Sequence, residues 1–289
     1  MNKKVAFIIN PKAGVKKKID LQQFIRDNFS KSIPFDIILW ENKDDFESIK
    51  KRIHEGGYTI AVACGGDGTV NQVAAAVKQT PVALGILPLG SGNGLARTLR
   101  IPMDLKKALK TIETASIRLI DGGTINGHSF FCTCGVGFDA HIAGRFASST
   151  KRGFWTYFKI TMGEFFSYKP KQYTIQADDV RVTTPAFLIT VANAGQWGND
   201  VYIAPKAKID DGIFHVSILK PFSNLTLPGL GLKIMNKRVH KSPSLQTLKG
   251  KNITISFDGV LPVHFDGEPT EFKDVIQVDV VPGALKVVC

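Results

Sequence analysis

Residues 65–71 carry the sequence Gly65-Gly66-Asp67-Gly68-Thr69-Val70-Asn71. They follow a strand-like run and precede a helical pattern that begins near Asn71. Glycines at such a junction let backbone N–H groups approach an anion, and a helix N-terminus favours its negative charge. Asp67 adds a carboxylate where phosphates would gather, which indicates that a cation such as Mg²⁺ mediates. The alternative interpretation, a tight strand-to-helix turn with an N-cap, explains less of this combination.

The segments around this loop alternate between strand and helix patterns. The expected strands are Val5–Asn10, Phe35–Trp40, Thr59–Ala63 and Val82–Leu87. The expected helices are Ile19–Phe29, a segment marked by Phe46, Ile49 and Ile53, the helix near Asn71, Ser91–Leu99 and Asp104–Ala115. This order predicts an α/β domain over residues 1–121 with a parallel, helix-flanked sheet. Ligands in such domains bind at the carboxyl ends of the strands.

Two further loops with glycine and polar residues follow expected strands. Residues 88–97 include Ser91, Gly92 and Asn93, and residues 10–14 begin with Asn10. Because the carboxyl ends of parallel strands lie at one edge of a sheet, we expect the three loops to converge on one crevice.

After Asp121 the pattern changes to short strands separated by turn residues. The expected strands are Phe130–Val136, Tyr173–Ala177, Ala186–Ala194, Ile213–Lys220, Asn252–Phe257, Val275–Val281 and Ala284–Val288. They predict an antiparallel β-sandwich or barrel-like domain over residues 122–289, interrupted by one aromatic helix at about Phe154–Tyr168.

Composition restricts the partners and the compartment. The 289 residues carry a formal net charge of +12, which favours anionic ligands, membranes or nucleic acid. The chain lacks the aromatic motifs, zinc fingers and helix-turn-helix signatures of nucleic-acid binding, so we expect no nucleic-acid partner. The apolar runs are too short to cross a bilayer and the N-terminus lacks a secretory signal, which indicates a cytoplasmic protein. The four cysteines have no metal-binding or disulfide spacing and are expected to be buried thiols.

Several common site types are excluded by their motifs. The chain contains no GxxxxGK[ST] loop and no GxGxxG after its first strand, and its histidines lack metal-ligand spacing. The late acidic turn from His264 to Pro269 is by itself most typical of a solvated hairpin.

Six blocks in this order resemble the diacylglycerol kinase catalytic-domain superfamily, which includes bacterial lipid kinases and sphingosine and ceramide kinases. The blocks are residues 10–14, 65–71, 88–97, 135–140, 210–212 and 265–269. The resemblance covers essentially the whole chain. It implies a nucleotide-binding α/β domain like that of NAD kinases and phosphofructokinases, a C-terminal β-sandwich, and an active site between the two. It also implies ATP and Mg²⁺ as cofactors.

The resemblance implies roles for particular residues. Asn10, Gly65–Asn71, Ser91, Gly92 and Asn93 would bind the nucleotide, and Asp67 would place Mg²⁺ or orient the acceptor hydroxyl. Glu268 would act as the general base. Asp139 would contact the lipid head. A second, structural Mg²⁺ would bind Asp211 and backbone oxygens near Lys208 and Ile213.

The resemblance implies a lipid kinase, with diacylglycerol as the first candidate acceptor. Gly94 departs from the Asp of the bacterial diacylglycerol enzymes, and the sequence Ser91-Gly92-Asn93-Gly94 keeps a sphingoid base as the alternative. A catalytically inactive nucleotide or lipid sensor and a soluble sugar or nucleotide kinase are further alternatives. Trp40, where the family often has Thr, and Ala13, where it has Ser, are other departures.

Two segments are candidates for peripheral contact with an anionic membrane. Residues 145–173 combine six Lys/Arg with many aromatic side chains, and residues 231–251 hold six Lys/Arg and no acid. Packing of the aromatic side chains in the core is the favoured alternative for the first segment, whereas the second is left open. A homodimer is also left open.

Overall fold

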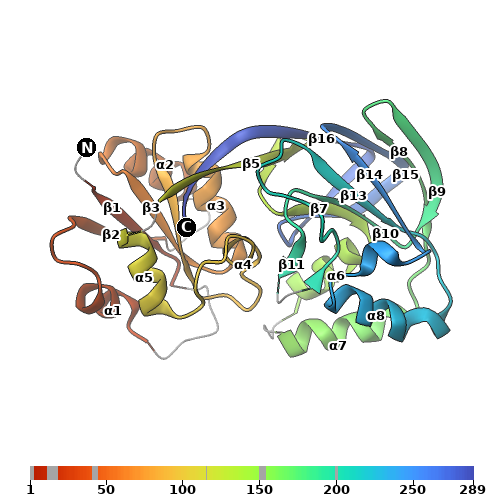
Figure 1. Cartoon of the computed structure of the whole chain (residues 1–289), viewed down its shortest axis with the longest axis horizontal. Coiled ribbons are helices and arrows are strands. Elements are labelled where there is room, and N and C mark those ends of the chain that lie inside the picture. Colours follow the sequence, from red (N-terminus) through yellow and green to blue (C-terminus); the bar gives the residue numbers. More distant parts are fainter. Residues whose placement is uncertain (1–2, 12–18, 41–44, 115, 150–153, 199–200) are drawn as a thin grey trace. The chain divides into compact units, whose positions relative to one another are not determined.

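The computed structural model describes residues 3–11, 19–40, 45–114, 116–149, 154–198 and 201–289. The chain forms two compact units, Met1–Ile120 with Gly283–Cys289, and Asp121–Pro282 (Figure 1). The expected boundary at residues 121 and 122 assigned the last residues to the second domain, whereas Gly283–Cys289 packs in the first unit.

The first unit is built on a parallel sheet. Its strands are β1 (Val5–Ile9), β2 (Phe35–Leu39), β3 (Ile60–Gly65) and β4 (Ala83–Pro88). They lie in the order β2-β1-β3-β4, and the end of β16 (Glu268–Val288) joins β4, with Val287 opposite Leu84. Strands β1, β3 and β4 are buried along their whole length, as expected for a parallel sheet covered on both faces.

Helices flank this sheet. They are α1 (Leu21–Asn28), α2 (Phe46–Glu55), α3 (Asp67–Val77), α4 (Gly94–Thr98) and α5 (Leu105–Thr114). Helix α2 contacts α3, and α1 contacts α5 (Figure 1). Helix α3 begins at Asp67, earlier than the expected start near Asn71. Helix α4 is shorter than the expected Ser91–Leu99, because Asn93 has a left-handed backbone (φ 52°) that no continuous helix contains.

The second unit is an antiparallel β-structure. Its strands are β6 (His128–Phe130), β7 (Thr133–Gly137), β8 (Lys171–Ala177), β9 (Val180–Ala186), β10 (Leu188–Ala192), β11 (Gln196–Gly198), β12 (Val201–Tyr202), β13 (Phe214–Leu219), β14 (Leu245–Gly250), β15 (Asn252–Phe265), most of β16, and β5 (Ile117–Ile125) from Asp121 onward. Strands β14, β13, β10, β7 and β15 are successive neighbours, and β15 also pairs with β8 and β16. They enclose a hydrophobic cluster that includes Phe130, Tyr173 and Phe214.

A second hydrophobic cluster lies between this sheet and three helices. The helices are α6 (Phe138–Ala147), α7 (Phe154–Phe165) and α8 (Leu227–Met235), and the short 3-10 helices η2 (Asn224–Thr226) and η3 (Val239–Lys241) flank α8. The cluster centres on Phe138, Phe187 and Leu188, with Ile160 of α7 and Leu230 of α8 packed on it. No helix among the described residues is both long and apolar enough to cross a membrane.

The structure confirms the predicted α/β unit followed by an antiparallel β-rich unit, and it corrects individual elements. Val275–Val281 and Ala284–Val288 belong to one strand, β16, which passes through Gly283 at a positive φ of 56° instead of ending there. Strands β5, β6, β9, β11, β12 and β14 and helices α6 and α8 were not expected. Cys64, Cys132 and Cys134 are buried, as predicted, whereas Cys289 is half-buried. Burial raises the pKa of the Cys64 thiol.

Candidate functional site

Three loops leave the parallel sheet of the first unit at the same edge. Ile9 is paired with Cys64, and Cys64 with Leu87, so Asn10, which follows β1, lies level with Gly65 and Pro88, the last residues of β3 and β4. The three loops therefore begin side by side at one edge of the sheet, as expected, with Asn10 half-buried. The crevice that they were predicted to form stays a prediction. Residues 12–14 of the first loop lie outside the described residues.

The loop after β3 leads directly into helix α3. Gly66 is the N-cap and Asp67 occupies the first helical turn, so the positive end of the helix dipole lies at this loop. Gly66, Asp67, Gly68 and Asn71 are half-buried, whereas Gly65, Thr69 and Val70 are buried. A Cβ on Gly65 would overlap the Thr69 side chain. The Thr69 side chain therefore packs against the backbone of its own loop and has a structural role.

Asp67 ties the first loop to the second. Its Oδ2 accepts a hydrogen bond from the Asn93 N–H at 2.9 Å, and its Oδ1 accepts one from the Gly94 N–H at 2.7 Å. The close approach depends on glycine, since a Cβ on Gly92 would lie 2.7 Å from Asp67 Oδ2 and a Cβ on Gly90 would lie 2.7 Å from the Gly66 Cα. The two loops thus form one rigid unit.

Asn93 holds the second loop in shape. It is 7% exposed, its Oδ1 accepts from the Gly90 N–H at 3.0 Å, and its Nδ2 donates to the Gly90 carbonyl at 2.8 Å. The Ser91 side chain is exposed beside it. Of the polar side chains predicted to bind the nucleotide in this loop, Ser91 is accessible and Asn93 acts by shaping the backbone.

Trp40 follows β2 at this edge of the sheet. It is 2% exposed, and its N–H donates to the Ile9 carbonyl at 2.8 Å. Its neighbour Glu41 lies outside the described residues. Trp40 therefore packs in the core in place of the expected polar contact.

In the second unit, Asp139 lies at the start of α6 in a buried polar cluster. It is 8% exposed, and its carboxylate accepts from the Ala140 N–H at 2.8 Å and the Thr190 hydroxyl at 3.1 Å. His264 Nε2 lies 3.0 Å from the same carboxylate. His264 is itself 4% exposed. The residue predicted to contact the lipid head is thus held by protein partners, and His264 is a partner that sequence reasoning missed.

Glu268 begins the second strand of the β15–β16 hairpin and is exposed. The turn before it has positive φ at both Asp266 (48°) and Gly267 (84°), as in a two-residue type I′ hairpin. The expected solvated acidic hairpin is therefore present.

Asp266 anchors this hairpin. Its carboxylate accepts the N–H groups of Phe131 at 2.8 Å, Cys132 at 2.8 Å and Thr133 at 3.0 Å. Hydrogen bonds from backbone N–H groups to an ionised carboxylate are stronger than those between neutral groups. Asp266 was not predicted to matter, although the Asp-Gly pair is the sequence signal of such a turn.

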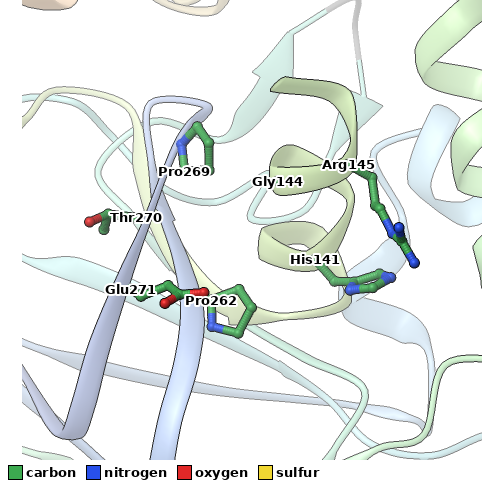
Figure 2. A pocket seen from close by; sticks show the side chains of 7 residues that line it. All are labelled: His141, Gly144, Arg145, Pro262, Pro269, Thr270 and Glu271. Atoms are coloured by element: carbon green, nitrogen blue, oxygen red, sulfur yellow. The ribbon is translucent and has the colours of Figure 1, made fainter. Parts of the chain in front are cut away.

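A pocket of about 580 Å³ lies between this hairpin and α6. Figure 2 shows His141 and Arg145 extending from α6, with Pro262, Pro269, Thr270 and Glu271 on the two hairpin strands. Glu268 immediately precedes Pro269 of the lining. A second pocket of about 310 Å³ shares His141 and Pro262 with the first and extends to Tyr168 and Leu261.

Glu164 and Arg145 form an ion pair beside these pockets. Glu164 of α7 accepts from His141 at 2.8 Å and lies 3.2 Å from Arg145. The hydrogen bond from His141, together with Arg145, lowers the pKa of the Glu164 carboxyl. With Lys169 and Lys171 also lining the second pocket, this region presents cationic and apolar groups together.

The residues predicted to hold a structural Mg²⁺ lie on the loop before β13. Asp211 and Lys208 are exposed and Ile213 is half-buried. The buried Asp121 accepts the Gly212 N–H at 2.7 Å, and its own N–H donates to Ile209 at 2.8 Å, which fixes the loop. Among the described residues, no group of three or more His, Cys, Asp or Glu side chains is arranged so that it could hold a metal ion. One carboxylate with backbone oxygens suits a hydrated Mg²⁺ in donor type, and this site stays a prediction.

Comparison with known proteins assigns the chain to a family. Residues 4–125 match the diacylglycerol kinase catalytic domain, and residues 132–289 match the YegS C-terminal NAD kinase beta sandwich-like domain. The chain is 30% identical over 86% of its length to a protein from Chromohalobacter salexigens named "probable lipid kinase YegS-like", covering 81% of that protein. A Pseudomonas aeruginosa protein of the same name is 29% identical over 86% of this chain and 82% of its own length.

Solved structures show the same fold. A diacylglycerol kinase from Bacillus anthracis superposes with a TM-score of 0.76 at 20% identity, covering 99% of this chain and 96% of that one. An NAD kinase from Archaeoglobus fulgidus in complex with ATP superposes with a TM-score of 0.55 at 13% identity, covering 99% and 93%. The chain therefore belongs to the lipid kinase family defined by a diacylglycerol kinase catalytic domain followed by a YegS C-terminal domain. This confirms the family resemblance and the enzyme class that it implies, an ATP-dependent lipid kinase.

Proposed function

We propose that the chain transfers the γ-phosphate of ATP to the hydroxyl of diacylglycerol in a membrane, which yields phosphatidic acid. The observation that carries the proposal is the pair of glycine loops joined by Asp67, with the N-terminus of α3 between them. Phosphoryl transfer depends on positioning and charge neutralisation more than on covalent chemistry, and rigid backbone donors provide both.

On the nucleotide side, the backbone around Gly66 and Gly68 and the exposed Ser91 hydroxyl would bind the phosphates. Asp67 keeps the two loops in register, and carboxylate oxygens are the kind of ligand that Mg²⁺ prefers. Mg²⁺ bound there would neutralise charge on the transferring phosphate. Asn10 would contribute its amide from the first loop.

On the acceptor side, we propose that the 580 Å³ pocket between α6 and the β15–β16 hairpin receives the glycerol end of the lipid. Arg145 and His141 could hydrogen-bond its ester oxygens, and Pro262 and Pro269 supply apolar walls. Glu268, exposed beside this pocket on the anchored hairpin, would accept the hydroxyl proton as general base. Chemistry requires that the base, the hydroxyl and the γ-phosphate meet during turnover.

The state of Asp139 supports a neutral acceptor. A sphingoid base carries an ammonium group, which needs an accessible carboxylate. Asp139 is buried and engaged with Thr190 and His264, so it offers little to such a group. Sphinganine remains the alternative acceptor, with the exposed Glu271 in the pocket as the carboxylate that it would use.

The test is transfer of labelled γ-phosphate from ATP to a panel of acceptors in mixed micelles. The panel contains diacylglycerol, sphinganine and ceramide, with soluble sugars and nucleosides as non-lipid acceptors. The proposal predicts label on diacylglycerol. Label on sphinganine alone would transfer the assignment to the alternative, and label on soluble sugars alone would remove the lipid acceptor. ATP binding without transfer to any acceptor would identify a sensor.

A further inference from the structure

Helices α7 and α8 expose apolar side chains although both pack on the same hydrophobic cluster. Ile160 and Phe165 of α7 and Leu230 and Ile234 of α8 face that cluster. The outer side chains are large and uncovered, with exposed fractions of 71% for Trp155, 67% for Phe166, 61% for Leu232, 70% for Met235 and 92% for Leu225. The aromatic side chains of residues 145–173 were expected to pack in the core. Phe165 and Tyr168 pack on the hydrophobic cluster, whereas Trp155 and Phe166 are exposed.

The exposed residues of α7 form a stripe. Trp155, Phe158 and Met162 are all exposed, and at 100° per residue they fall within an arc of about 60°. Phe166, directly after the helix, is exposed as well. Trp155 and Phe158 are in edge contact, with ring centroids 6.1 Å apart. Ile160, which packs on the cluster, lies on the opposite side of α7, so packing on the cluster does not account for the exposed stripe.

The charges around this face are positive. Lys159 on α7, Lys169 after it, and Lys237, Arg238 and Lys241 after α8 are exposed. The chain has no Asp or Glu from residue 212 to residue 257. Glu164, the acid of α7, is paired with His141 and Arg145 on the pocket side. The α7–α8 face, defined by the exposed apolar and basic residues above, therefore combines aromatic, aliphatic and cationic groups.

We infer that the α7–α8 face docks on an anionic lipid bilayer, with Trp155, Phe158 and Met162 entering the interfacial region. Aromatic and aliphatic side chains surrounded by Lys and Arg are the chemistry that binds such surfaces. A second copy of the chain is a poorer occupant, since pairing this face with itself would bring like charges together. The inference rests on the proposed function, which requires access to a lipid acceptor.

The α7–α8 face lies next to the pockets proposed to receive the lipid. Glu164, Ser167 and Tyr168, at the C-terminal end of α7, line the 310 Å³ pocket that adjoins the proposed acceptor pocket. All these residues belong to the second unit. Docking through α7 would therefore bring the pocket entrance to the lipid surface.

Trp155 gives a direct readout of docking. The other two tryptophans are Trp40, 2% exposed, and the half-buried Trp197, so a change on vesicle binding reports mainly on Trp155. With phosphatidylglycerol-containing vesicles we expect a blue shift of emission and quenching by brominated acyl chains, both absent with phosphatidylcholine alone. Trp155→Phe should remove both signals. Equal signals on neutral and anionic vesicles, or none on either, would overturn the inference.

A triple variant separates docking from catalysis. Trp155→Ser, Phe158→Ser and Met162→Ser together should lower binding to anionic vesicles by about tenfold or more. Val180→Ser, which changes an equally exposed apolar residue on β9, should not. Thermal melts of the triple variant should match the parent, because all three side chains are exposed.

Assays of diacylglycerol phosphorylation test membrane docking and the proposed function separately. The triple variant should lose phosphorylation of diacylglycerol in vesicles but retain that of a monomeric, short-chain diacylglycerol. Loss of both activities in a folded variant would contradict a docking role. Vesicle binding without phosphorylation of any lipid would leave docking in place and remove the proposed function. A parent that sediments as a dimer, dissociated by the triple variant, would assign the face to a second copy.

Discussion

The carboxylate of Asp67 accepts the backbone N–H of Gly94 at 2.7 Å. Gly94 departs from the Asp that the family resemblance implies at this position, yet its N–H is half of the connection between the two glycine loops. The other half is the Asn93 N–H. Asp67 is thus both the residue expected to place Mg²⁺ or orient the acceptor hydroxyl and the residue that joins the two glycine loops.

Asp67→Asn should therefore affect both structure and catalysis. An amide offers one acceptor oxygen and turns an NH₂ donor toward the second backbone N–H, so one buried donor loses its partner. We expect about 1–3 kcal/mol of lost stability, together with a loss of turnover of roughly a hundredfold or more. Urea unfolding and steady-state kinetics measure the two effects. Unchanged stability would show that the loop connection contributes little.

Gly92→Ala should weaken ATP binding through packing alone. The new Cβ would lie 2.7 Å from Asp67 Oδ2, so one of the loops has to move. Overpacking of this kind costs about 1–3 kcal/mol. Calorimetric titration with ATP measures the loss, and Gly229→Ala, which meets no atom within 4 Å, is the matched control. Equal ATP affinity of the two variants would contradict a rigid, close-packed cradle.

Asp266→Asn should loosen the hairpin that carries Glu268. Asn tolerates the left-handed backbone at this position, so the change isolates the carboxylate that accepts three N–H groups. We expect a loss of about 2–3 kcal/mol in unfolding free energy. Asp274→Asn is the control. Asp274 lies in the same hairpin and also has positive φ, but its carboxylate accepts one backbone N–H, that of Gly259, in place of three. A smaller loss for Asp266→Asn than for the control would refute the anchoring role.

The Glu164 cluster should contribute stability that depends on pH. Its hydrogen bond from His141 and the nearby Arg145 lower the pKa of the Glu164 carboxyl below the ordinary 4.5. A lowered folded-state pKa means that the contribution is present above pH 4.5 and is lost as the pH falls through the folded value. Melting temperatures of the parent should approach those of Glu164→Gln over that acidic range.

Glu47→Gln serves as the control for the pH dependence of the melting temperature, because Glu47 is an exposed carboxylate on α2. If the melting temperatures of the parent and Glu164→Gln differed by the same amount from neutral to acidic pH, the interaction of Glu164 with His141 and Arg145 would not contribute pH-dependent stability.

The sequence predicted the parallel sheet well because its strands are short, buried and separated by clear turn signals. It predicted the glycine loops because Gly-rich strand ends carry their own signature. It could not reveal that Asp67 bonds residues 93 and 94, since that contact joins segments about 26 residues apart through backbone groups. It also divided β16 at Pro282-Gly283, where tertiary pairing carries the strand through a local break signal.

The second unit was harder to predict for a physical reason. Asp139 and His264 are far apart in the chain, and only strand pairing brings β15 beside β7 and places both side chains in one buried cluster. The exposure of Trp155 and Phe158 likewise depends on which face of α7 the sheet covers. An aromatic composition does not specify that face.

Transfer of γ-phosphate from ATP to diacylglycerol by Glu268→Gln tests the central claim most directly. Asp258→Asn, an exposed acid elsewhere on β15, serves as the control. Loss of a general base predicts a fall in turnover of about 10²–10⁴-fold with unchanged ATP affinity and stability. Turnover by Glu268→Gln equal to that of the parent and of Asp258→Asn would contradict the account.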